Sequence, residues 1–170
     1  MKAYKFLRPG AVGPFSGFQW PVDEWVEADE ATLCASGVHA CRVEDLPYWI
    51  GAELWEVELD GAREEYRKLV AARGRLIRRV EAWDDGARAG FAHACAARVR
   101  DRADEATPER AEQLAAYAAD AAANAARGEV AVVGYIAARA AEVDAGAEGY
   151  AAEREAQARW LASRLRLDAT

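Results

Sequence analysis

The chain has 170 residues, a formal net charge of −7 at pH 7 and an apolar fraction of 52%. This length fits one domain or a pair of small subdomains, and a chain of this size buries roughly 70% of its unfolded surface. The acidic excess argues against a dedicated nucleic-acid-binding protein, and the absence of a run of 18 apolar residues argues against a membrane-spanning helix.

The first residues and the cysteine content point to the cytoplasm. The start of the chain, MKAYKFLRP, has neither the long apolar stretch nor the small-residue cleavage site of a signal peptide. Three cysteines are an odd number, which suits reduced thiols better than a set of disulfides. We therefore expect a cytoplasmic protein.

The part of the chain before residue 82 is rich in aromatic and β-branched residues and predicts short strands. Runs bounded by Gly and Pro place these strands at residues 2–7, 24–28, 38–42, 54–59, 68–72 and 76–80. We expect the last two to form a hairpin that turns through Arg73 and Gly74. One short helix is expected between the third and fourth strands, at residues 44–51, with acidic residues at its start and Gly51 at its end.

From residue 82 onward the chain is rich in Ala with periodic larger residues, which predicts helices at 82–104, 108–127, 129–145 and 147–166. Thr107 and Pro108 suit the start of the second helix, and Gly128 suits its end. The run Val130–Val133 fits a buried strand equally well. The fold class expected is therefore α+β. A small mixed or antiparallel sheet with one short helix forms residues 1–81, and an Ala-rich helical bundle forms residues 82–170.

The tripeptide His-Ala-Cys occurs twice, at 39–41 and at 93–95. On a strand, residues two apart share a face, so His39 and Cys41 are predicted to project together. On a helix, residues two apart lie about 200° apart around the axis. In the second copy, Cys95 is therefore expected in the core and His93 on the opposite side.

The ligand types for zinc are present, but their spacing is not that of a standard zinc site. Cys34, His39 and Cys41, with Cys95 or His93 added across the fold, would offer thiolate and imidazole groups. No Cys-x-x-Cys pair exists, so we assign no metal ligands. The simplest interpretation is that Cys34 and Cys41 pack in the core and His39 is hydrogen-bonded under a loop.

Tryptophans crowd the beginning of the chain and allow two interpretations. Trp20, Trp49 and Trp55 either fill the core of a small sheet or, with Cys41, line an aromatic-walled pocket near His39 for a planar or cationic ligand.

Residues 63–79 contain seven basic side chains and only two acidic ones. This stretch either binds phosphate or an acidic partner, or simply solvates two strands and a turn. We favour the second interpretation.

The run LCASGVHAC at 33–41, with GFQW at 17–20 and LWEVELDG at 54–61, resembles an uncharacterised domain of actinobacterial and phage proteins. Its recurring core is Leu-Cys-x-x-Gly-Phe/Val-His-Ala-Cys, and the resemblance covers residues 1–83. The Ala-rich remainder is similar to helical repeats of bacterial immunity proteins.

The N-terminal half also resembles small ADP-ribosyltransferases of the rifampin-modifying type in the order of its elements, which is strand, short Trp-containing helix, strand ending VELDG and basic stretch. This resemblance implies a split sheet that holds NAD, with His39, Tyr48 and Glu58 as the catalytic candidates. An aromatic ring would then stack on the nicotinamide, and a carboxylate would stabilise an oxocarbenium-like transition state.

Two functions follow as hypotheses. The first is a cytoplasmic module that binds a small molecule or a protein near His39, with the helical half as support or as a homo-oligomer interface. The alternative is a small NAD-dependent transferase.

Overall fold

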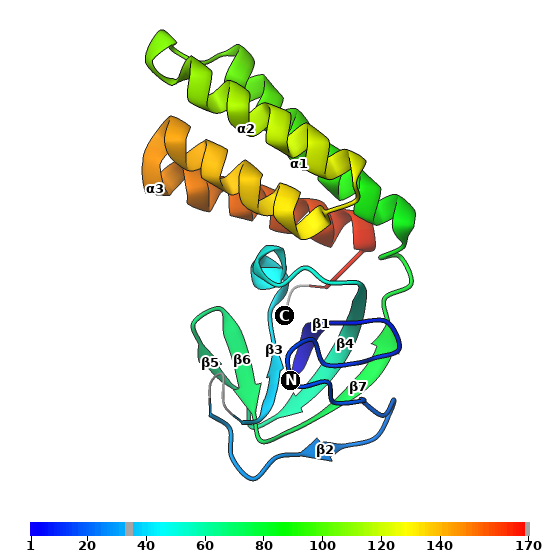
Figure 1. Ribbon diagram of the computed structural model, residues 1–170. Helices are drawn as coiled ribbons and strands as arrows, with labels where there is room; N and C mark the ends of the chain where they lie inside the picture. Colours follow the sequence, from blue (N-terminus) through cyan, green and yellow to red (C-terminus); the bar gives the residue numbers. More distant parts are fainter. Residues whose placement is uncertain (33–35, 169–170) are drawn as a thin grey trace. The chain divides into compact units, whose positions relative to one another are not determined.

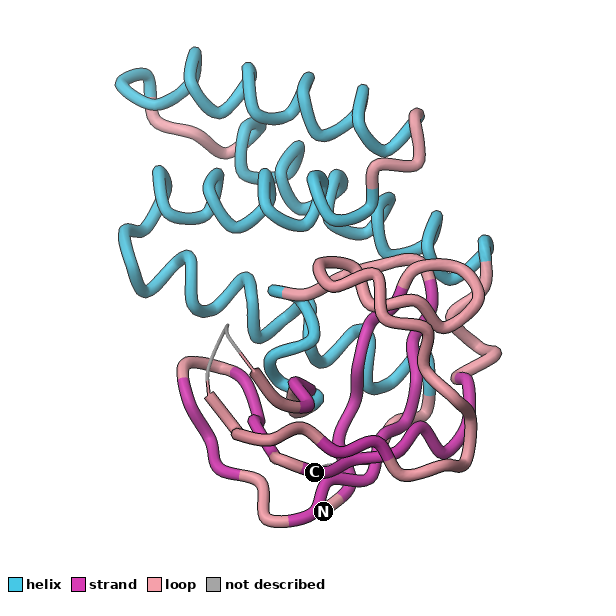
Figure 2. The backbone as a smooth tube through the Cα atoms, turned by 60° about the horizontal axis from the view of Figure 1, so that its bottom comes forward, coloured by secondary structure: helices cyan, strands magenta, loops and turns pink. Residues whose placement is uncertain are grey.

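The computed structural model describes residues 1–32 and 36–168, and the fold is α+β as predicted. The chain forms two compact units. Unit 1 comprises Met1–Trp83 together with Leu165–Thr170, and unit 2 comprises Asp84–Arg164. The described strands all belong to unit 1, and nearly all of the α-helical residues belong to unit 2 (Figure 2). None of the helices in the described ranges is long and apolar enough to cross a bilayer.

Unit 1 is built from two antiparallel sheets (Figure 1). The four-stranded sheet has the order β1-β4-β7-β2, with β1 at Lys2–Leu7, β4 at Glu53–Asp60, β7 at Arg73–Arg79 and β2 at Val26–Glu27. The three-stranded sheet has the order β3-β6-β5, with β3 at Val38–Ala40, β6 at Lys68–Ala71 and β5 at Arg63–Glu65.

The two sheets meet where β1 lies beside β3. Tyr4 and Cys41 exchange both backbone hydrogen bonds there, at 2.9 and 2.8 Å. On its other edge β1 pairs with β4 along its whole length, from Lys2 opposite Glu58 to Leu7 opposite Glu53. Strand β1 therefore belongs to one sheet and borders the other. We call this border the seam.

The two sheets enclose a common apolar core. Side chains from one face of each sheet form it, together with the loop that follows β1: Ala3, Leu7, Ala11, Trp20, Val38, Ala40, Trp55, Val57, Leu59, Leu69, Ala71 and Leu76. Every second residue of β3, β4 and β6 contributes, as the two-residue period of a strand requires. On the opposite face of β1, Phe6 meets Trp83 edge-to-face with ring centroids 5.7 Å apart.

The predicted hairpin between residues 68–72 and 76–80 is wrong. Strand β6 pairs with β3 and β5, whereas β7 pairs with β4 and β2, so the chain changes sheets at Ala72. Gly74 lies inside β7 rather than in a turn. A Cβ at this position would be 2.8 Å from Val38 Cγ1, so a side chain would separate the two sheets where they touch. Strand β5, which pairs with β6, was not predicted.

The short helix expected at 44–51 is a 3-10 helix, η1, at Val43–Tyr48. It begins directly after Cys41 and Arg42, and it buries Leu46 completely. Pro47 inside the segment removes a backbone donor, which favours a short helix over a longer α-helix.

Unit 2 contains α1 at Asp85–Asp104, α2 at Pro108–Ala126 and α3 at Val130–Leu165. Asp84 caps α1 by accepting a hydrogen bond from the Ala87 N–H at 2.7 Å. Pro108 starts α2 and Gly128, at φ 74°, follows its end, both as predicted. In the described part of the chain the Thr107 side chain makes no capping hydrogen bond to α2. The run at 130–133 is helical and not a strand.

The predicted break between the last two helices is real, because Ala145 and Gly146 leave helical geometry inside α3. The two halves of α3 lie against each other: the Gln157 side chain donates to the Gly134 carbonyl at 2.9 Å (Figure 1). Near the bend the backbones approach even more closely. A Cβ on Gly149 would be 2.2 Å from the carbonyl oxygen of Ala141.

Replacing two helical glycines by alanine should change stability in opposite directions, because the backbones approach closely at Gly149 but not at Gly90. Gly149→Ala should lower the free energy of unfolding by roughly 2 kcal/mol, because a rigid backbone carbonyl blocks the new methyl group. Gly90→Ala is the matched control. Its Cβ would be 3.4 Å from Trp160, an ordinary contact, so helix propensity should raise stability by about 0.5–1 kcal/mol. Urea unfolding measures both, and equal effects in the two variants would contradict the close approach.

Candidate functional site

Lys5 occupies a position that should be apolar. It lies in β1 between Ala3 and Leu7, which belong to the core of unit 1, and directly opposite Trp55, which belongs to the same core. Because side chains alternate along a strand, Lys5 starts on the core-facing side of β1. The residue is half-buried.

The Lys5 ammonium reaches across the seam. Its Nζ donates a hydrogen bond of 2.5 Å to the carbonyl oxygen of His39 in β3, and it lies 5.2 Å from the ring centroid of Trp20. In the described part of the chain no carboxylate comes within ion-pair distance of this amine. Lys2, three residues earlier, is different: its Nζ is 2.9 Å from Asp168 and 3.3 Å from Glu56.

The environments of the two lysines shift their pKa values in opposite directions. Burial lowers the pKa of Lys5 to about 8, with a further contribution from the charge of Lys68, although Cys41 acts in the opposite sense. The hydrogen bond to Asp168 raises the pKa of Lys2. At neutral pH, Lys5 is therefore the more easily deprotonated amine of the two.

His39 lies on the same seam and is half-buried. Its Nδ1 is 3.1 Å from the carbonyl oxygen of Gly37. Burial lowers the pKa of His39, and the positive charges of Lys5 and Lys68 lower it further. The imidazole is therefore neutral at pH 7, and it can exchange hydrogen bonds without adding a charge.

Lys68, in β6, completes a group of basic side chains. It lies close enough to Lys5 and His39 for its charge to affect both, and its Nζ is 4.2 Å from the ring centroid of Trp49. We define the seam site as Lys5, Trp20, His39, Trp49 and Lys68. Its charged groups are cations held against indole rings.

The predicted pocket residues are placed in different surroundings. Trp20 and Trp55 are buried in the core of unit 1, and the Trp55 indole donates to Glu53 at 3.1 Å. Trp49 is half-buried and donates to the carbonyl oxygen of Arg67. Cys41 is buried at the Tyr4 pair, and burial raises the pKa of its thiol well above the usual range, so it is not a nucleophile.

The candidates of the transferase hypothesis make separate contacts. Tyr48 lies at the end of η1, with the Arg67 guanidinium 4.3 Å from its ring centroid. Glu58 is bound by Arg75 at 2.8 Å and lies opposite Lys2, whereas His39 is reached from Lys5, further along β1.

The second His-Ala-Cys copy behaves as predicted. Cys95 is completely buried with Ala87 and Phe91, and His93 is exposed. Cys34, one of the possible ligands named above, lies outside the described residues. Among residues 1–32 and 36–168, no three His, Cys, Asp or Glu side chains form a group that would hold a metal ion.

The basic stretch 63–79 has acidic partners for all its arginines. Most of these partners come from outside the stretch, and the pairs are Arg63–Glu65, Arg67–Asp45, Arg73–Glu27, Arg75–Glu58, Arg78–Glu56 and Arg79–Glu53. This pattern favours solvated, paired strands over a phosphate-binding patch.

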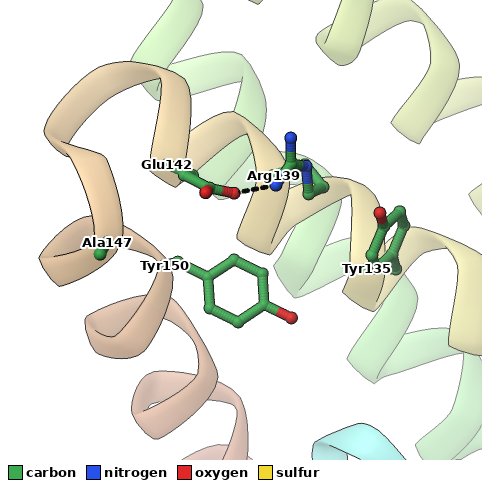
Figure 3. A pocket seen from close by; sticks show the side chains of 5 residues that line it. All are labelled: Tyr135, Arg139, Glu142, Ala147 and Tyr150. Carbon is green, nitrogen blue, oxygen red and sulfur yellow. Dashed lines mark hydrogen bonds and ion pairs between the residues drawn. The ribbon is translucent and has the colours of Figure 1, made fainter.

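A hollow of about 310 Å³ lies in unit 2 at the bend of α3. Tyr135, Arg139, Glu142, Ala147 and Tyr150 line it, and Arg139 and Glu142 are bound to each other (Figure 3). Since its charged groups already neutralise one another, this hollow offers less to a charged ligand than the seam site does.

Sequence reasoning did not identify Lys5, although a signal was present. The chain has three lysines, at positions 2, 5 and 68, among 22 basic residues. Two of the three belong to the seam site. A lysine between apolar residues in a predicted strand, in a chain that otherwise uses arginine, marks a position where the two cations are not equivalent.

Comparisons with known proteins bear on unit 1. A family model described as Domain of unknown function (DUF7666) matches residues 1–87, just over half of the chain. This match agrees with the expected uncharacterised domain at 1–83. No curated protein and no solved structure matches the chain, so the likenesses to ADP-ribosyltransferases and immunity proteins gain no support.

The buried charge of Lys5 should lower stability in a way that depends on pH. The pKa of the Lys5 amine is about 8 in the native state and 10.5 in the unfolded state. Between these pH values the unfolded state binds more protons, so the free energy of unfolding rises with pH. Lys5→Met should therefore raise the free energy of unfolding by about 1–2 kcal/mol at pH 7. This gain should disappear by pH 10.5.

Urea unfolding of both proteins at the two pH values measures this difference. Lys2→Met is the control, because Lys2 has carboxylate partners and its removal should not stabilise the protein at either pH. A Lys5→Met variant that is less stable than the native chain at pH 7 would show that the Lys5 ammonium does not lower the free energy of unfolding.

Proposed function

Since the chain belongs to the DUF7666 family, whose description names no activity, we propose its function from its own residues: unit 1 binds a small anionic molecule at the seam site. The observation that carries this proposal is the Lys5 ammonium, which is half-buried beside the core and reaches a carbonyl oxygen but no described carboxylate. A charge in this position costs free energy unless an opposite charge joins it.

The charges around Lys5 define the chemistry of the ligand. Lys68 and Lys5 repel each other, and both lower the pKa of His39, so an added anion would relieve repulsion as well as pair with an ammonium group. Charge-assisted hydrogen bonds from ammonium groups to a carboxylate or phosphate are among the stronger ones in proteins. A carboxylate or phosphate therefore suits the seam site better than a cation or a neutral molecule.

The indole rings hold these cations in position. Trp20 is buried beside Lys5, and the Trp49 ring lies beneath Lys68. Cation–π contacts restrict both lysine side chains before a ligand arrives, which reduces the entropy lost on binding. This use of the tryptophans differs from the aromatic-walled pocket that the sequence suggested.

The transferase alternative has less support from the geometry. It needs His39, Tyr48 and Glu58 to act on one substrate, but Glu58 is bound to Arg75 and lies towards the opposite end of β1 from His39. NAD carries a diphosphate, so its binding remains one form of the anion proposal and is tested with it.

Two further expectations remain proposals. Cys41 and Cys95 are buried free thiols, which suits a reducing cytoplasm.

Val132 and Tyr135 are 42% and 54% exposed on the first half of α3, and they are the apolar groups we would place in a homo-oligomer or protein interface of the helical half.

Thermal unfolding with added anions tests the binding proposal. The full chain is heated with sodium pyrophosphate, citrate or NAD at matched ionic strength, with sodium chloride as the reference. At least one anion should raise the melting temperature, because a ligand present at 100 times its Kd stabilises the native state by about 2.7 kcal/mol.

Variants localise the effect. Lys5→Met should abolish the response and Lys68→Gln should weaken it, whereas Lys2→Gln should respond like the native chain. Equal responses in all four proteins would place the anion elsewhere, and no response to any of the three anions would contradict the proposal.

A further inference from the structure

The use of lysine at position 5 is informative by itself. Arginine is the common cation of this chain, and its planar, permanently charged group binds carboxylates and phosphates in a bidentate manner. Lysine offers what arginine does not, an amine that can lose its proton and become a nucleophile. Anion binding alone would not require that property at Lys5.

We propose that Lys5 is a carbonyl-reactive amine, which forms an imine with the aldehyde or ketone group of a small anionic molecule bound at the seam site. This inference rests on the proposed function, because the anionic group of that molecule is what the site recognises. It adds a chemical class to the ligand and a reaction to the binding module.

The surroundings of Lys5 favour the neutral amine. The side chain is half-buried beside Trp20 and Trp55, so water stabilises its charge poorly. The nearby positive charge of Lys68 acts in the same direction. Desolvation and a neighbouring cation are the two devices by which proteins activate lysine nucleophiles.

The hydrogen bond to His39 is compatible with the reaction. A neutral amine still has N–H groups, so Nζ can donate to the His39 carbonyl while its lone pair points elsewhere. This bond fixes the position of the nitrogen at the seam. Lys68, from the neighbouring sheet, can hold the anionic group of the same molecule.

The chemical step is balanced without an oxidant or reductant. The Nζ lone pair attacks the carbonyl carbon, the carbonyl π bond opens as a C–N bond forms, and one nitrogen proton passes to the oxygen to give a carbinolamine. The hydroxyl group then leaves as water with the remaining nitrogen proton, and the nitrogen electron pair forms the C=N bond. An amine and a carbonyl compound thus become an imine and water.

Lys2 is an internal control in the same strand. Its ammonium group has Asp168 and Glu56 as partners, so it stays charged and unreactive at neutral pH. With only three lysines in the chain, the reacting amine can be identified among Lys2, Lys5, Lys68 and the N-terminal amine of Met1.

The test uses pyridoxal 5′-phosphate as the probe, because it combines an aldehyde with a phosphate. The full chain is incubated with the probe at pH 7.5, the imine is reduced with sodium borohydride, and peptide mass spectrometry locates the adduct. Lys5 should carry at least about tenfold more label than Lys2, because its fraction of neutral amine at pH 7.5 is more than roughly a hundredfold higher.

The pH dependence is a second readout. Labelling of Lys5 should rise with pH around 8. The other groups that face this amine are His39 from β3, Cys41 directly after β3, Lys68 from β6 and the rings of Trp20 and Trp55. Lys68→Gln should shift this rise to higher pH, because the charge of Lys68 lowers the pKa of Lys5, and it should lose the preference for pyridoxal 5′-phosphate over pyridoxal.

Lys5→Arg and Lys5→Met should both lose the major adduct, with circular dichroism showing that they are folded. Label spread evenly over Lys2, Lys68 and Met1, or unchanged total label in a folded Lys5 variant, would overturn the inference. Anions that stabilise the native chain without any Lys5 adduct would refute imine formation and leave the binding proposal intact. A Lys5 adduct that excess pyrophosphate does not reduce would support the reactive amine and contradict the anion site.

Discussion

Unit 1 depends on strand β1, because this strand connects its two sheets. The amount of backbone pairing differs greatly between the two edges of β1. Its pairing with β4 is continuous, but among the described residues its backbone link to the other sheet is the pair of hydrogen bonds between Tyr4 and Cys41, the residue directly after β3. Further along the seam, the donor to the His39 carbonyl is the Lys5 ammonium. A side chain that bridges two strands in this way cannot turn out to solvent without breaking the bridge, so the fold keeps this amine at the seam.

This amine contrasts with the basic residues of the stretch 63–79 that have carboxylate partners. The arginines of residues 63–79 meet carboxylates from β4, η1 and β2, although such exposed pairs contribute little stability. Lys5 has instead a carbonyl oxygen and an indole ring. Lys5 lies beside the apolar core that Trp20, Trp55 and their neighbours form, where an ammonium is poorly solvated. Such costs are commonly retained where they serve function.

Unit 2 contains a buried charge whose partners lie within the same unit. Glu153, 1% exposed, accepts hydrogen bonds from Arg98 at 2.7–3.0 Å and from Gln157 at 2.9 Å. Gln157 in turn binds the backbone of Gly134, so the network ties the two halves of α3 to α1. Small residues make this close packing possible, as at Gly149. The contrast with Lys5 is direct: here the buried carboxylate has its cation within the same unit.

Local patterns were sufficient for the α+β class, most helix ends, the opposite faces of His93 and Cys95, and most of the strands, because these follow from the periods of 3.6 and 2 residues. Pairing between strands did not follow from them. The apparent hairpin at Arg73–Gly74 is a change of sheet, since Gly74 is needed where Val38 and Leu59 come close, and this requirement exists only once the two sheets meet. The seam site was likewise hidden, because Lys5, His39 and Lys68 lie on three strands whose proximity depends on the order β4-β1 and β3-β6. The sequence by itself determined most of the residues that form helices and strands, and it showed that lysine is rare in this chain. Only the tertiary structure decided that Lys5 is half-buried between two sheets. Burial and the neighbouring charge of Lys68 lower its pKa there.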